Sequence, residues 1–341
     1  DTFAKRWAPY HYDVQISGTQ AVQQFAEFYC KQMHGKKAEY AGDATIQGRE
    51  RVLGVISTND PENKETIEKD LRAALQAGCG ATIAHTYYYA QDISTADQQR
   101  RAGVAKMREN PEATTVLCYC DLVAPAFLYQ TQEEQKYRPE NVLAGSGFMD
   151  SDKAARAYDT LLPGDPTCEC DPNNPSKRGG NNVFVNAFGL SQIEAQEPFG
   201  KDVFSRVWKA SQGGLPPCRS CGDPNTAPYE AASQKWEYYS MLATMLQSAG
   251  PKLTPQNVAI GVSAVQPRGG AGRLTRSLSP QKGDYTWNDD MRLVYWSPTR
   301  PSSFDGVAGS YVDLFPGRRF GLGDHKPGDF VLPPKQGRGR P

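Results

Sequence analysis

Apolar residues over positions 1–200 follow two alternating patterns. In 64–77, Ile67, Leu71 and Leu75 share one face at a spacing of about 3.6 residues per turn, which is typical of an amphipathic helix. In 51–57 the apolar and β-branched residues are contiguous and end at a turn cluster, which is typical of a buried strand. The same alternation predicts further helices over 21–33, 94–108, 125–134 and 151–158, and further strands over 82–86, 114–119, 141–144 and 183–186.

Strands that alternate with helices in this way are the signature of βαβ units. Because crossovers between parallel strands are right-handed, helices are expected on both faces of the sheet. Ser94 is expected to cap the helix over 94–108, with Asp97 three residues further on. The pattern therefore predicts an α/β fold with a doubly wound parallel sheet.

The regular alternation of helical and strand patterns is interrupted in the second half of the chain. Two segments rich in Pro, Gly and Asn, 163–182 and 213–228, are expected to be surface loops. The longest helical stretch spans 229–250, and Thr254 opens another helix. After Asp284 the sequence is aromatic-rich and strand-like. We expect one α/β domain, a lobe of its own, over 1–200 and 284–320, part of the other lobe over 201–283, and a disordered tail over 321–341.

Composition narrows the class of protein. The 38 Lys and Arg balance the 38 Asp and Glu, so charge gives no reason to expect a nucleic acid or an anionic membrane as partner. No apolar run reaches the length of about 18 residues that a membrane crossing requires. The segment that starts at Asp1 is not a signal peptide, and either a leader was removed or this is not the native beginning.

The eight cysteines are read most simply as disulfides formed in an oxidising compartment, although reduced thiols remain an alternative. We expect a disulfide between Cys30 and Cys79, which lie on and after two helices. Cys118 and Cys120 are either free and buried or bonded to each other. The four loop cysteines fit two disulfides, which we favour, or a tetrahedral zinc site. These four are Cys168, Cys170, Cys218 and Cys221.

The sequence shows no recognisable catalytic motif. The four histidines are scattered, and the nucleophile-elbow, P-loop and zinc-protease patterns are absent. The sequence Gly145–Gly147 lacks the full dinucleotide fingerprint. We therefore expect a protein that is not an enzyme and that uses neither a cofactor nor a metal.

Ligands of open α/β sheets bind outside the carboxyl ends of the strands. That rule selects four predicted loops here, and backbone amides, hydroxyls and aromatic rings are the groups that would hold a small molecule in them. Asp121 fits either a ligand amine or the cap of the next helix, and Asn59 and Asp60 also fit a simple turn. Three consecutive tyrosines cannot all face the core, because alternate side chains of a strand point to opposite faces. The candidate ligand-binding residues are Thr58, Asn59, Tyr87, Tyr88, Tyr89, Asp121, Ser146, Gly147 and Phe148.

Several segments, taken in order, resemble the type I periplasmic-binding-protein family, in particular substrate-binding proteins of branched-chain amino acid ABC transporters from actinobacteria. The likeness lies in their order and spacing rather than in any one piece. The segments are 26–43, 49–60, 113–128, 137–152, 187–191, 238–250 with 253–257, and 317–320. This resemblance implies an extracytoplasmic protein that captures a small solute by closure of two lobes and delivers it to a membrane permease.

The chain departs from the family in one respect. Family members begin with several βαβ units that form a first lobe, and a deficit of roughly 100–150 residues is expected here. The resemblance therefore implies that the chain is a fragment or that a separate chain supplies the first lobe. Two alternatives remain open: a sensory or receptor ectodomain of the same fold, and a structural or assembly protein that reuses it.

Overall fold

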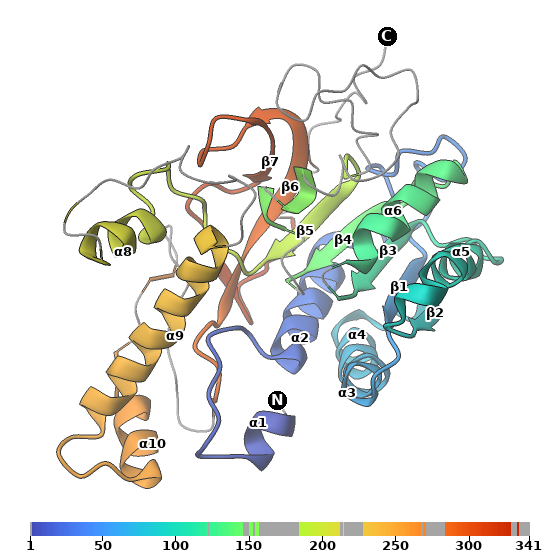
Figure 1. Ribbon diagram of the computed structural model, residues 1–341. Coiled ribbons are helices and arrows are strands. Elements are labelled where there is room, and N and C mark those ends of the chain that lie inside the picture. Colours follow the sequence, from blue (N-terminus) through green and yellow to red (C-terminus); the bar gives the residue numbers. More distant parts are fainter. Residues whose placement is uncertain are drawn as a thin grey trace. The chain divides into compact units, whose positions relative to one another are not determined.

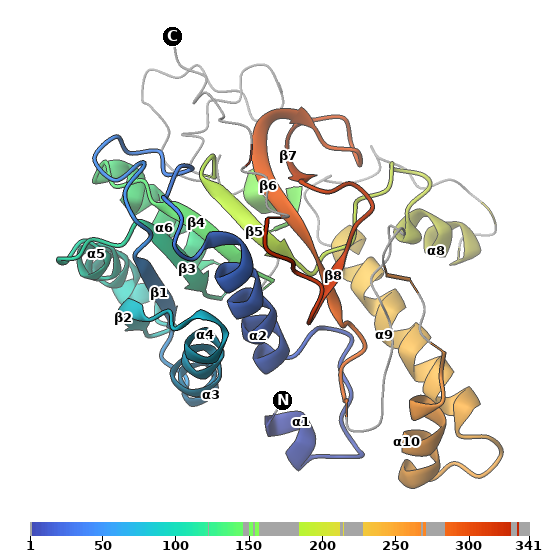
Figure 2. The same cartoon turned by 180° about the vertical axis from the view of Figure 1, so that it is seen from behind.

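The computed structural model describes residues 2–121, 123–145, 150–152, 154–156, 184–211, 214, 228–266, 269–270, 284–328 and 333 (Figures 1 and 2). The chain divides into two compact units. Unit 1 comprises Asp1–Ser17, Glu194–Asp289 and Ser303–Gly306, and unit 2 comprises Gly18–Ile193, Asp290–Ser302 and Val307–Pro341. Each unit is described by itself.

Unit 2 is built on an eight-stranded sheet. Its strands run in the order β2-β1-β3-β4-β5-β6-β7, and β8 pairs with β6. The first five of these strands are parallel, whereas β6, β7 and β8 are antiparallel additions. The strands are β1 (Leu53–Thr58), β2 (Ile83–Tyr89), β3 (Thr115–Tyr119), β4 (Glu140–Ala144), β5 (Ala187–Ser191), β6 (Asp290–Pro301), β7 (Ala308–Asp313) and β8 (Phe320–Gly321).

Helices cover both faces of this sheet, as the two opposite views show (Figures 1 and 2). One group packs together on one face: α2 (Gly18–Phe28), which continues through the π-helical turn Tyr29–Met33, and the run α3 (Pro61–Glu65), Thr66–Leu71 and α4 (Arg72–Cys79). The other group, α5 (Ala96–Met107) and α6 (Ala124–Glu134), packs on the opposite face. The predicted α/β fold with a mostly parallel, doubly wound sheet is therefore confirmed.

Local sequence explains where the first crossover helix begins and ends. The Asp60 side chain accepts a hydrogen bond from the Asn63 N–H at 2.9 Å, and Pro61 occupies the first turn. Gly80 ends the helical run in the left-handed conformation, with φ of 69°. Between these ends, Ile67, Leu71 and Leu75 are fully buried, as their spacing predicts.

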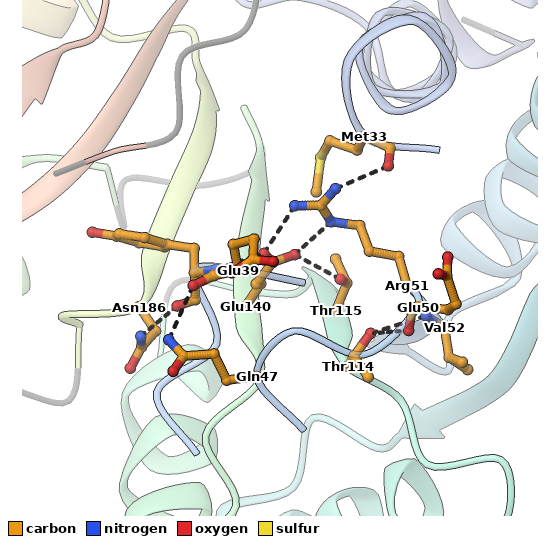
Figure 3. Close-up of polar contacts among 11 residues, drawn as sticks. Met33, Glu39, Gln47, Glu50, Arg51, Val52, Thr114, Thr115, Glu140 and Asn186 are labelled. Atoms are coloured by element: carbon orange, nitrogen blue, oxygen red, sulfur yellow. Dashed lines mark hydrogen bonds and ion pairs between the residues drawn. The ribbon is translucent and has the colours of Figure 1, made fainter. Parts of the chain in front are cut away.

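A buried ion pair joins the amino ends of the strands (Figure 3). Arg51 donates to both oxygens of Glu140, at 2.8 and 3.0 Å, and both side chains are buried. Glu140 also accepts from the Thr115 hydroxyl at 2.8 Å and the Tyr40 N–H at 3.1 Å, while Arg51 donates to the Met33 carbonyl at 2.9 Å. Both carboxylate oxygens of Glu140 therefore have partners. Through Arg51 and Met33, this network ties the end of the helix that begins as α2 to β3 and β4.

Unit 1 is helical in its described residues. It contains α1 (Thr2–Arg6), α8 (Val203–Ser211), α9 (Pro228–Ser248) and α10 (Pro255–Ser263). Thr254 caps α10 by accepting from the Asn257 N–H at 3.2 Å, as predicted. In a small buried cluster of unit 1, Met241 of α9 packs with Val14, which lies before α2, and with Trp287, which lies before β6. Within these residues, the only β pairing of the unit is an isolated bridge between Asp13 and Thr286.

Several local predictions need correction. Ser94 is not the cap of α5: the Asp92 side chain accepts from the N–H and the hydroxyl of Ser94, and a short 3₁₀ turn precedes the helix. The strand predicted over 183–186 lies later, at Ala187–Ser191. Residues 184–186 form a turn, in which the Ala187 N–H donates to the Phe184 carbonyl at 2.8 Å, and the Phe184 ring packs against Tyr129 and Trp296.

The segment predicted as a disordered tail is folded in part. The N–H groups of Gly323 and His325 donate to the Glu27 carboxylate at 2.6 and 2.8 Å, and the His325 ring stacks on Phe320. Residues 321–328 therefore belong to unit 2. The rest of the predicted tail lies, except for Pro333, outside the described residues.

Candidate functional site

The carboxyl ends of the parallel strands meet at one edge of the sheet in unit 2. The chain passes from β1 outward to β2 and then returns to β3 on the other side of β1, so the strand order reverses between β1 and β3. Open α/β sheets bind their ligands at such a switch point. Thr58 is the last residue of β1, Asn59 follows it, and Asp121 follows β3, so candidate residues from both strands flank it.

The three tyrosines at the end of β2 have three different environments. Tyr87 packs beneath α5, where Gly103 leaves room for its ring. Tyr88 points to the opposite face, and its hydroxyl donates to Glu68 at 2.6 Å. Tyr89, the most buried of the three, reaches along the edge toward β3. The predicted alternation of faces is thus confirmed, and only Tyr89 meets another candidate residue through its side chain.

Tyr89 and Asp121 form the centre of the edge. The Tyr89 hydroxyl donates to Asp121 Oδ2 at 2.9 Å and accepts from the Asp121 N–H at 2.9 Å. Asp121 Oδ1 accepts from the N–H groups of Val123 and Ala124, at 2.7 and 2.9 Å, and so caps α6. Of the two roles predicted for Asp121, the structure shows the capping role. A carboxylate has about four acceptor positions, which leaves roughly one for a ligand donor.

Thr58 and Asp60 are engaged with each other. The Thr58 hydroxyl donates to Asp60 and accepts from the Asn63 amide at 2.7 Å. Asn59 is exposed, and its backbone N–H donates to the Tyr89 carbonyl at 2.7 Å, which holds the ends of β1 and β2 together. Thr58 is buried and serves this turn, whereas the Asn59 side chain faces solvent at the edge.

Charges at the edge are set by burial and hydrogen bonding. Burial raises the pKa of Tyr89, and the Asp121 carboxylate raises it further, so this phenol stays neutral at pH 7. Burial alone would raise the pKa of Asp60, but hydrogen bonds from Thr58 and the Asn63 N–H hold it below its usual value. The edge therefore presents a neutral Tyr89 hydroxyl and an ionised Asp60 carboxylate.

A disulfide lies directly before Asp121. Cys118 and Cys120 are bonded to each other, with 5.1 Å between their Cα atoms. The predicted pair Cys30 and Cys79 is also bonded, with a Cα separation of 5.4 Å, and it links the first long helix to the end of α4. Each of the four cysteines in the described part of the chain is thus in a disulfide.

Several predicted residues lie outside the described part of the chain. Ser146, Gly147 and Phe148 do so, and the nearest described position is Gly145, whose carbonyl accepts from the Gln192 amide at 2.6 Å. The loop cysteines also do so, so the choice between disulfides and zinc at these positions stays a prediction. They are Cys168, Cys170, Cys218 and Cys221.

One buried carboxylate near this edge was not predicted. Asp150 follows the β4 loop and is buried near Ser191, at the end of β5. Burial raises the pKa of Asp150 to about 6, and the Ser191 hydroxyl and the Arg292 charge oppose that rise only in part. Asp152 is buried as well, and burial also raises its pKa. No sequence signal marks either residue, because their burial depends on packing from β5, β6 and β7.

The described residues contain neither a cluster of metal ligands nor a membrane-spanning helix. Three His, Cys, Asp or Glu side chains do not gather anywhere among them in a way that would hold a metal ion. None of the helices that the structure describes has the length and apolar content needed to cross a membrane.

No protein-family model matches the chain, and no curated protein is similar to it in sequence. Solved structures do match. A possible leucine/isoleucine/valine-binding protein from Rhodopirellula baltica is 12% identical with a TM-score of 0.53, and the match covers 91% of this chain and 68% of that one. A periplasmic binding protein type 1 from Bordetella pertussis is 13% identical with a TM-score of 0.50, over 89% and 67% of the two chains. The chain has the fold of type I periplasmic binding proteins.

A third neighbour with the type I periplasmic-binding-protein fold contains a ligand. It is a solute-binding protein of an ABC transporter from Rhodopseudomonas palustris in complex with p-hydroxybenzoic acid, at 7% identity, a TM-score of 0.53 and coverage of 93% and 69%. Across the neighbours, the chain spans 64% to 71% of the other chain's length. About a third of each neighbour therefore has no counterpart here. At this level of identity the likeness concerns the fold.

Proposed function

We propose that this protein is an extracytoplasmic solute-binding protein that captures a small molecule and delivers it to the permease of an ABC importer. The observation that carries the proposal is the convergence of the Tyr89 hydroxyl and the Asp121 carboxylate at the switch point of a type I periplasmic-binding-protein fold.

The proposed ligand site consists of the carboxyl-edge loops of unit 2. Asp121 would accept a hydrogen bond from a ligand donor, and Asn59 and Tyr89 would flank it. The predicted loop residues Ser146, Gly147 and Phe148 would contribute from β4. The remaining predicted residues act behind the site: Tyr88 is turned toward Glu68, Tyr87 is beneath α5, and Thr58 holds the turn.

Delivery to a permease requires a closed and an open state, which two lobes joined by a hinge provide. Unit 2 would be the second lobe. The first lobe would be completed by polypeptide outside these 341 residues, either in the same protein or in a separate chain. An extracytoplasmic location agrees with the two disulfides, since such bonds persist in oxidising compartments.

The test is a ligand screen by isothermal titration calorimetry on the protein isolated from its native cells. The panel would contain branched-chain amino acids and hydroxybenzoates. One structural neighbour is described as a possible leucine/isoleucine/valine-binding protein, and another is in complex with p-hydroxybenzoic acid. Tyr89→Phe should weaken the best ligand about tenfold, since it removes the hydroxyl that orients Asp121, and one lost hydrogen bond is worth about 1.4 kcal/mol. The matched control, Tyr88→Phe, removes a hydroxyl that faces Glu68 and should leave affinity unchanged. Equal effects of both variants would refute this site.

A further inference from the structure

The two disulfides of unit 2 differ in the length of chain that they enclose. Cys30 and Cys79 are 49 residues apart in the sequence, whereas Cys118 and Cys120 are 2 residues apart. A disulfide restricts the unfolded chain more strongly as the loop that it closes becomes longer. The bond between Cys30 and Cys79 is therefore suited to stabilising the whole unit. The bond between Cys118 and Cys120 constrains little beyond these residues, so its effect is local.

This short disulfide lies where β3 parts from β4. The two strands pair only over Thr115–Leu117, although β3 continues along β1 as far as Tyr119. In an extended strand, residues i and i+2 share a face and their Cα atoms are about 6.6 Å apart, which is two rises of about 3.3 Å. The Cα atoms of Cys118 and Cys120 are 5.1 Å apart. The bond therefore holds a contracted backbone directly before Asp121.

The contracted backbone sets the position of Asp121, which the proposed ligand site uses. The Asp121 N–H and carboxylate each form a hydrogen bond of 2.9 Å with the Tyr89 hydroxyl, so the main chain and the side chain must both be in place. The preceding residue, Cys120, is buried, and its Sγ lies 3.5 Å from the Ile56 carbonyl oxygen of β1. Cys120 is thus held by β1 and by its bond to Cys118.

We propose that the Cys118–Cys120 disulfide positions Asp121 and makes ligand capture depend on the oxidised state of this bond. The proposal rests on the solute-binding function proposed above. A dithiol reductant supplies two electrons and two protons: the S–S bond breaks, two thiols form, and the reductant becomes a disulfide. Both cysteines are 8% exposed, so the reductant reaches them when this edge opens locally. Without the bond, the backbone relaxes toward an extended strand, and the Asp121 N–H moves away from the Tyr89 hydroxyl.

The first part of the test needs no ligand. Hydrogen exchange of the Asp121 amide is followed by NMR in the isotopically labelled protein, with and without dithiothreitol, and in the double variant Cys118→Ala/Cys120→Ala. Either way of removing the bond should speed exchange of this amide about tenfold, the equivalent of one lost hydrogen bond, and leave the amides of β1 unchanged. Mass spectrometry after alkylation shows which disulfides the dithiothreitol has reduced.

The matched control is the double variant Cys30→Ala/Cys79→Ala. It removes the bond that encloses the longer loop, so it should lower the urea midpoint more than Cys118→Ala/Cys120→Ala does. It should nevertheless leave exchange of the Asp121 amide unchanged. A purely stabilising role of both bonds would give the opposite order at Asp121.

The second part uses the best ligand of the calorimetric panel. Dithiothreitol should weaken its affinity about tenfold in the unsubstituted protein and in Cys30→Ala/Cys79→Ala, as Tyr89→Phe does. Cys118→Ala/Cys120→Ala should bind about tenfold more weakly from the start and should not respond further to dithiothreitol. This comparison separates the short disulfide from every other cysteine of the chain.

Three results would overturn the proposal: a Cys118–Cys120 bond that dithiothreitol does not reduce in the folded protein, unchanged exchange at Asp121 after its loss, or a ligand affinity that is independent of it. The proposed function fails separately. If the Asp121 amide responds as expected but no ligand of the panel binds, the disulfide positions Asp121 and the solute-binding function is wrong. If a ligand binds equally well without the bond, that function stands and the redox dependence does not.

Discussion

The two units of this protein differ in how completely they bury their apolar faces. In unit 2, helices cover both faces of the sheet, and residues such as Leu71, Leu75 and Val104 are fully buried. In unit 1, the longest helix of the described chain leaves Trp236 and Tyr239 about half exposed or more. Both units contain apolar helices, so composition does not separate them. Among the described residues, unit 2 contains a sheet and unit 1 does not, so a helical pattern alone does not predict how completely a helix is buried.

The largest expected effect concerns the buried ion pair of unit 2. Glu140→Gln leaves Arg51 buried without a carboxylate, which should cost about 3–5 kcal/mol of unfolding free energy. Urea denaturation followed by circular dichroism measures the change. The matched control is Glu65→Gln, which removes an exposed pair with Lys69 and should cost less than about 1 kcal/mol. Similar costs for both variants would show that the Glu140 network does not stabilise the unit.

The two units should respond differently to the same substitution. Leu71→Ala removes a fully buried side chain from unit 2 and should cost about 2–5 kcal/mol. Leu242→Ala removes an exposed side chain from α9 and should change stability by less than about 0.5 kcal/mol in the 341-residue chain. Urea denaturation of both variants decides. A cost above about 2 kcal/mol for Leu242→Ala, on the scale of core truncations, would mean that unit 1 buries this side chain.

The buried Asp150 should destabilise unit 2 at neutral pH. Its folded pKa, about 6, is raised above the ordinary value of 3.8, so the folded state holds the proton longer than the unfolded state. Stability therefore falls as pH rises from about 4 to about 6, and a shift near two units corresponds to about 3 kcal/mol. Asp150→Asn should recover up to that amount at pH 7 and nothing at pH 4. A gain from Asp150→Asn that is the same at pH 4 and pH 7 would contradict the burial of the charge.

The smallest effect concerns a helix cap in unit 1. Thr254→Ala removes the acceptor for the Asn257 N–H, which should cost about 1 kcal/mol. Hydrogen exchange should speed up within α10 and leave β3 unchanged, because the cap stabilises only its own helix. Faster exchange in β3 as well would show that the two units unfold together.

The sequence predicts those features that depend on local pattern. Ile67 and Leu71 were placed in the core by helical spacing, and Cys30 and Cys79 were paired because they lie on and after neighbouring helices. The carboxyl-edge rule brought Tyr89 and Asp121 to one place, although it did not predict that they bond to each other. Such predictions succeed because period and strand direction determine which residues share a face or an edge.

Other features depend on contacts that no local pattern encodes. The antiparallel direction of β6 follows from its pairing with β5, and alternation along a strand does not specify direction. Asp92, not Ser94, satisfies the first turn before α5, because a 3₁₀ turn shifts the helix start. The helical stretch over 229–250 is predicted from the sequence, but only the structure shows that Trp236 and Tyr239 on it are exposed.

The most direct test of the contrast between the two units is native-state hydrogen exchange on the 341-residue chain. Amides of β1, β3 and β4 should exchange only through global unfolding of unit 2. Amides of α9 and α10 should exchange through an opening that requires less free energy, by at least about 2 kcal/mol, since the described residues of unit 1 contain no sheet against which these helices could pack. That result would support the contrast between the two units. Equal protection of α9 and β3 would contradict the account, because unit 1 would then be as complete as unit 2.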